Sequence, residues 1–121
     1  MSPSRSDNFT RNLRQTAIYW GNPVNDGYGG RTFDDAEEID VRWEDRQEMF
    51  IDSSGQQKLS RAVVFIGRDV QVGSYIYLGE LIDLSQAQIE NPLIFLGTYE
   101  VRAFTKIPDL KGEAFVRKIW L

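Results

Sequence analysis

Short apolar runs separated by turn residues extend over most of the chain. Ile39, Val41 and Trp43 alternate with polar residues, which is the period-two pattern of a half-buried strand. Ala62–Ile66 is continuously apolar and predicts a central strand, buried on both faces, over Lys58–Ile66. Asp52–Gly55 has the composition of a hairpin turn. Further strands are expected at Gln15–Gly21, Gln47–Ile51, Tyr75–Leu78, Thr98–Lys106 and Ala114–Leu121.

One short segment, Asp83–Asn91, has the signals of a helix rather than a strand. Ser85 and Gln88 fit a capping box at its start, and Pro92 ends it. Strands at intervals of roughly 10 residues with one short helix predict an all-β domain. We expect a small β-barrel of about six to seven strands over residues 15–121, because closing a sheet removes exposed edges.

Two segments fall outside this pattern. Residues 1–14 are polar with little periodicity, and we expect a flexible N-terminal tail. Residues 21–36 form a long loop with four glycines, one proline and several Asn or Asp, so nothing in it favours a ladder or a helix. Loops longer than about 12–15 residues tend to be functional or disordered. The loop is therefore expected to gain order only when it contacts a partner.

Composition excludes several kinds of chemistry. The chain of 121 residues has no cysteine and no histidine, which rules out disulfides, Ser-His-Asp or Cys-His catalysis, and zinc sites built on imidazole. We therefore expect no enzymatic activity, no cofactor and no metal. No apolar run approaches the ~20 residues of a membrane span, and the N-terminus lacks an apolar signal core. The default expectation is a protein made in a cytoplasm with no membrane partner.

Charge is distributed unevenly around a net value of −4. Nine acids between Asp34 and Asp52 face only Arg42 and Arg46. They form either a solvated sheet face or an acidic patch that docks a basic partner or repels phosphate. Arg5, Arg11 and Arg14 make the N-terminal tail basic, and we expect them to dock an acidic neighbour.

Two aromatic residues of the long loop are candidate anchors for a partner. Tyr28 and Phe33 lie among polar residues, where a lone domain has little reason to bury them. Aromatic side chains often anchor protein–protein contacts, so we expect both to bind a neighbouring subunit. The candidate residues that face a partner or a channel are Asn25, Asp26, Tyr28, Arg31, Phe33, Asp34 and Asp35.

Several stretches of apolar and turn residues form a specific pattern, namely Ile51–Gly55, Ser60–Ile66, Asp69–Gly73, Tyr75–Gly79, Val101–Phe104, Pro108–Gly112 and Lys118–Leu121. This pattern resembles the head–tail joining proteins of tailed bacteriophages, the small head-completion or stopper proteins of the phage neck. The resemblance covers roughly residues 15–121 and consists of dispersed apolar and turn signals.

The resemblance implies a β-barrel that assembles into a ring of about six or twelve copies in the virion neck. Its partners would be a portal or adaptor protein on one side and a tail terminator or tail-tube protein on the other. The ring would retain the packaged genomic DNA in the head, and the DNA would pass through its channel without sequence-specific binding. The loop of residues 21–35 occupies the place of the channel-facing loop.

Other functions stay open at this point. The same signals fit a tail terminator, an adaptor or another tail-tube component. A small barrel that binds oligosaccharide or single-stranded nucleic acid is a further alternative, although such barrels use aromatic platforms within a basic groove and this chain is acidic. A hydrolase is the third class, disfavoured by the absence of histidine and cysteine.

Overall fold

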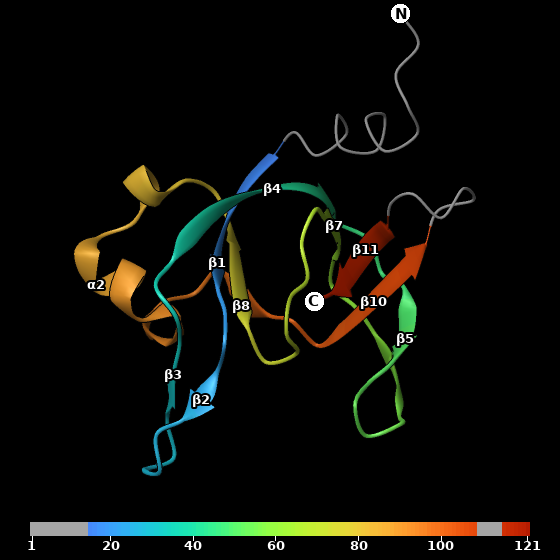
Figure 1. Cartoon of the computed structure of the whole chain (residues 1–121), viewed down its shortest axis with the longest axis horizontal. Coiled ribbons are helices and arrows are strands. Elements are labelled where there is room, and N and C mark those ends of the chain that lie inside the picture. Colours follow the sequence, from blue (N-terminus) through green and yellow to red (C-terminus); the bar gives the residue numbers. More distant parts are fainter. Residues whose placement is uncertain (1–14, 109–114) are drawn as a thin grey trace, which may run out of the picture.

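The computed structural model describes residues 15–108 and 115–121, and within them the fold is all-β. A seven-stranded antiparallel sheet curls into a half-barrel in the order β10-β11-β7-β4-β1-β8-β9 (Figure 1). Its strands are β1 (Gln15–Trp20), β4 (Glu37–Glu44), β7 (Val63–Ile66), β8 (Tyr75–Leu78), β9 (Thr98–Glu100), β10 (Ala103–Pro108) and β11 (Phe115–Trp120). The all-β prediction is thereby confirmed. The predicted tail over residues 1–14 lies outside the described residues.

The core is built around the central strands of this sheet. Val41, Val64, Ile66, Ile76 and Ile119 are fully buried in it. β7 pairs with β4 on one side and β11 on the other, which is the central position that its continuous apolar run predicted. β1 departs from simple alternation, because all four residues from Ala17 to Trp20 are buried. Its second face is covered by the helical segment described below.

The two edge strands of the sheet are almost continuous in sequence. The predicted single strand Thr98–Lys106 is wrong, because β9 and β10 lie at opposite ends of the strand order and only Val101 and Arg102 separate them. The Val101 amide donates to the Ser74 carbonyl (2.8 Å), and the Arg102 amide donates to the Trp120 carbonyl (2.9 Å). The linker is therefore hydrogen-bonded towards both edges, and the backbone itself connects the two ends of the curled sheet.

A second predicted strand, Lys58–Ile66, is also divided. β6 (Gln57–Leu59) pairs with β5 (Met49–Ile51) in a separate hairpin, and β7 begins only at Val63. Ser60 lies at the division, where its buried hydroxyl accepts from the Glu48 amide (3.0 Å) and its amide donates to the Glu48 carbonyl (3.0 Å). The predicted turn at Asp52–Gly55 is confirmed, with the Gly55 amide donating to the Asp52 carbonyl (3.0 Å).

Between β8 and β9 the chain forms a helical segment, residues 80–97. It contains η1 (Leu81–Asp83), α2 (Gln86–Glu90) and η2 (Pro92–Ile94), and the predicted capping box between Ser85 and Gln88 is present at α2. Trp20 fixes the segment to the sheet: its indole nitrogen donates to the Ile89 carbonyl (2.8 Å) and its ring meets Phe95 edge-on at 6.4 Å. Within the described residues, no helix is long and apolar enough to cross a membrane.

The long loop of residues 21–36 has a ladder of its own. β2 (Val24–Asn25) and β3 (Arg31–Thr32) pair as a short antiparallel hairpin that projects from the body (Figure 1). The expectation that nothing in this stretch favours a ladder is therefore wrong. We call residues 21–36 the arm.

Candidate functional site

The tip of the arm is a tight turn held by its own side chains. One Asp26 carboxylate oxygen accepts from the backbone amides of Tyr28 (2.7 Å) and Gly30 (3.0 Å), and Asn25 accepts from the Gly27 amide (3.0 Å). Gly27 and Gly29 have φ angles of 83° and 85°, which glycine adopts without strain. Asn25 and Asp26, predicted to face a partner, thus already have bonds within the turn. Because Asn and Asp side chains bond the turn and Gly adopts its positive φ angles, these residue types dominate the tip of the arm.

The flank of the arm packs on the body through an aromatic contact and an ion pair. Phe33 is half-buried and meets Tyr75 edge-on at 5.5 Å, while Arg31 pairs with Glu100 at 3.2 Å. Burial raises the pKa of the Tyr75 phenol, and the nearby Glu100 carboxylate raises it further. The expectation that the lone domain does not bury Phe33 is therefore wrong. Tyr28 differs, because 95% of its surface is exposed at the tip.

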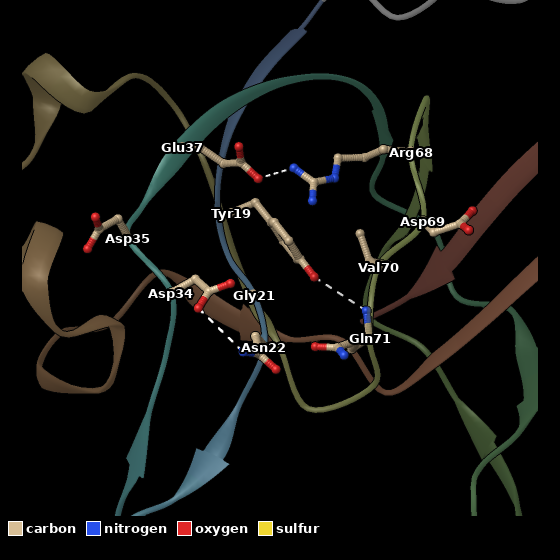
Figure 2. Close-up of a pocket in the computed structure, with 10 residues that line it drawn as sticks. All are labelled: Tyr19, Gly21, Asn22, Asp34, Asp35, Glu37, Arg68, Asp69, Val70 and Gln71. Atoms are coloured by element: carbon tan, nitrogen blue, oxygen red, sulfur yellow. Dashed lines mark hydrogen bonds and ion pairs between the residues drawn. The ribbon is translucent and has the colours of Figure 1, made fainter.

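The base of the arm borders an open pocket of about 330 Å³ (Figure 2). The Asp34 amide donates to the Gly21 carbonyl (2.9 Å), which holds the two ends of the arm together. Asp34 and Asp35 line the pocket, where Arg68 pairs with Glu37. The remaining lining residues include Tyr19, Asn22, Asp69, Val70 and Gln71.

This pocket has an interior wall of fixed hydrogen bonds. The Tyr19 hydroxyl bonds the buried Ser74 hydroxyl (3.0 Å) and accepts from the Gln71 amide (3.3 Å). The Arg68 guanidinium lies over the Tyr19 ring, 5.1 Å from its centre. Each of these polar groups has a partner within the chain, and together they hold the segment between β7 and β8 against β1. Within the described residues, no group of three or more acidic side chains is arranged to hold a metal ion.

Four of the nine acids in the predicted acidic stretch, including Glu37 with Arg68, pair with cations of the same chain. Glu44 pairs with Arg42 and Arg46, Glu48 pairs with Lys118, and Asp52 pairs with Lys58. The bond from Lys118 lowers the pKa of Glu48. The Ser54 hydroxyl, followed by the Gln56 amide, lowers the pKa of Asp52 to about 2. These paired acids fit the solvated-face interpretation. Within the described residues, the other five acids of this stretch have no such ion pair: Asp34, Asp35, Glu38, Asp40 and Asp45.

Sequence reasoning missed two exposed apolar surfaces. The hairpin patch consists of Met49, Ile51 and Leu59, which are 53–59% exposed on one face of the β5–β6 hairpin. The helical patch consists of Leu93, Ile94 and Leu96, and Leu96 is 98% exposed. The sequence holds a signal for the second, because Leu93–Leu96 is a run of four apolar residues just after a helix-ending proline. Isolated exposed apolar residues are ordinary, but groups of them mark interaction surfaces.

No family model, curated protein or solved structure matches this chain. The features that bear on its function are therefore the arm, the two patches and the pattern of charges. Arg5, Arg11 and Arg14, the predicted docking residues of the tail, lie outside the described residues.

Proposed function

We propose that this protein is a structural component of the neck of a tailed phage particle, where it joins head to tail as a ring around the DNA channel. It would bind a portal or adaptor protein on one side and a tail terminator or tail-tube protein on the other. Its activity would be mechanical and adhesive rather than catalytic: it would retain packaged DNA and offer the tail an attachment surface.

The observation that carries this proposal is the combination of a rigid body with projecting, apolar-tipped elements. The arm exposes Val24 and Tyr28, the β5–β6 hairpin exposes the hairpin patch, and the helical segment exposes the helical patch. Each is fixed at its base, for example by the Phe33–Tyr75 contact of the arm. A monomeric protein gains nothing from presenting apolar side chains on fixed projections, whereas an assembly subunit buries them against its neighbours.

The pattern of charges is consistent with a wall that DNA passes without binding. Tight binding to nucleic acid requires lysine and arginine side chains that are free to neutralise phosphates. Here most cations of the described residues have a carboxylate partner, such as Lys106 and Arg117, which both bond Asp69. The bond from Arg117, followed by that from Lys106, lowers the pKa of Asp69. A barrel for single-stranded nucleic acid would need an open basic groove instead.

A nonsense mutation in the gene of the encoding phage tests this function. We expect heads that lose their DNA and tails that remain unattached, both visible by negative-stain electron microscopy of lysates. Complementation with the intact chain should restore joined particles and infectivity. Normal tailed particles made without the protein would refute the proposal.

The arm supplies a sharper variant of the same test. Replacing Val24 and Tyr28 by serine removes exposed apolar surface without touching the turn bonds of Asp26 or the Phe33 contact. If the arm tip contacts a neck partner, this variant should fold normally but restore far fewer joined particles. The matched control is Val72→Ser, which removes an exposed valine outside the arm and the two patches, and should complement fully.

A further inference from the structure

We infer that copies of this chain meet head to tail, with the helical patch of one copy against the hairpin patch of the next. The inference rests on the proposed structural role and assigns the two surfaces through which neighbouring copies would contact each other. Four observations support it: the rigidity of each patch, their opposite positions, their matching apolar character and the unpaired charges beside them.

The hairpin patch is held outward by the other face of its own ribbon. Met49 and Leu59 are register partners, and Ile51 follows on the same face, since residues two apart along a strand share a face. Phe50 points the opposite way, is buried and stacks on Trp120 at 6.0 Å. The body thus fixes the inner face, and the outer face presents three large apolar side chains to a neighbour.

The helical patch is also fixed to the body, by the residues Pro92 and Phe95 that lie between its members in the sequence. Pro92 is buried and its carbonyl accepts from the Thr98 hydroxyl (2.9 Å). Phe95 packs edge-on against Tyr77 at 5.7 Å, while Leu96 beside it is almost fully exposed. Leu96 directly follows the anchored Phe95 and is 98% exposed, so its side chain is available to a neighbouring molecule.

Unpaired charges of opposite sign accompany the two patches. Glu80, Asp83 and Glu90 are exposed in the helical segment, and residues 69–101 contain no lysine or arginine. Arg61 and Arg102 are the cations of the described residues without a carboxylate partner. Arg61 is exposed and follows Leu59 by two residues, whereas Arg102 lies on the inner side of the hairpin against Phe50. They line one pocket of about 290 Å³, and the Arg102 guanidinium lies 4.7 Å from the centre of the Phe50 ring.

This complementarity identifies a second copy as the occupant. Among the described residues, the exposed carboxylates of the helical segment have no ion pair, and neither has the exposed Arg61 beside the hairpin patch, so the two surfaces carry charges of opposite sign. The helical segment and the β5–β6 hairpin lie at opposite sides of the sheet (Figure 1). Two different surfaces on opposite sides give a heterologous contact, which can be repeated from copy to copy, whereas an isologous contact stops at a dimer.

Cysteine cross-linking tests the contact directly, because the chain has no native cysteine. The purified full chain carrying both Leu59→Cys and Leu96→Cys is treated with a short bis-maleimide at high protein concentration. We expect a ladder of dimers, trimers and larger products. A mixture of the two single variants should give dimers only, and each single variant alone should stay monomeric.

The matched control pair is Leu96→Cys with Ile107→Cys, which keeps one site and moves the other to an exposed isoleucine of β10. A ladder of equal strength from this pair, no ladder from the first pair, or dimers from one single variant alone would each overturn the inference. Adding Met49→Asp to the first pair should reduce the ladder at least tenfold, and an unchanged ladder would count against the assignment.

The outcome separates this inference from the proposed function. If cross-linking fails but the nonsense mutant lacks joined particles, the contact is wrong and the neck function stands. If the ladder forms but the phage assembles normally without the chain, the contact stands and the neck function is wrong.

Discussion

We expect the arm to pack against the body in the isolated protein, and we expect Phe33 to hold it there. Phe33→Ala removes the edge-on contact with Tyr75. An aromatic pair contributes about 0.5–1.5 kcal/mol beyond its buried area. Complete burial of a phenylalanine side chain contributes roughly 1.5–3 kcal/mol, so a half-buried ring supplies about 1 kcal/mol more. The substitution should therefore destabilise the docked arm by about 2 kcal/mol.

Hydrogen exchange of single amides measures this effect. The amides of Asp26 and Asp34 bond the carbonyls of Gly30 and Gly21, so both report on the arm. A loss of about 2 kcal/mol raises the population of the undocked arm roughly thirty-fold. We expect both amides to exchange faster by about that factor, while the Val101 amide in the body changes far less.

Tyr28→Ala is the matched control, since the ring it removes is 95% exposed. It should leave exchange in the arm unchanged. Exchange of the Asp26 and Asp34 amides at the rate of an unfolded chain in the unmodified protein would refute the reasoning altogether. It would mean that the arm is ordered only by neighbours, as the sequence alone suggested.

Three further predictions concern the body. Asp52→Asn should destabilise the chain at pH 7. The difference in stability from the unmodified chain should shrink as the pH falls from about 4 towards 2, because the lowered pKa of Asp52 contributes stability that is lost as the pH approaches its folded value of about 2. Urea midpoints that differ by the same amount at pH 7 and at about pH 2 would contradict this. Tyr19→Phe leaves the buried Ser74 hydroxyl without its partner and should lower the free energy of unfolding in urea by about 1–2 kcal/mol, and adding Ser74→Ala should recover part of this loss. A loss below about 0.5 kcal/mol would argue against a buried bond. Gly73→Ala forces a side chain into a φ of 93° and should cost about 1–2 kcal/mol by the same assay, and no measurable loss would show that this turn relaxes.

Local patterns predicted most of the sheet, because the burial of a strand on one or both faces determines which of its residues are apolar. The alternation at Ile39, Val41 and Trp43 and the apolar run of β7 both correspond to strands in the expected places. The capping box at Ser85 and Gln88 was predictable for the same reason, since its partners are only three residues apart.

Local patterns could not predict contacts between residues that are far apart in the sequence. Nothing near Phe33 indicates that Tyr75, forty-two positions later, covers it, and nothing near Val101 indicates that the chain changes sheet edge there. The pairing of Glu48 with Lys118 likewise depends on β11 lying beside β7. The predicted patch of acids therefore overestimated the free negative charge.

The two-residue link between β9 and β10 has a consequence for how this protein fails under load. In an open sheet an outer strand can be peeled away alone, one hydrogen bond after another. Here Val101 and Arg102 connect the outermost strands, so a pull on either is transmitted to the other. The body should consequently resist force up to a threshold and then rupture in a single event, a property suited to a part that must withstand pressure.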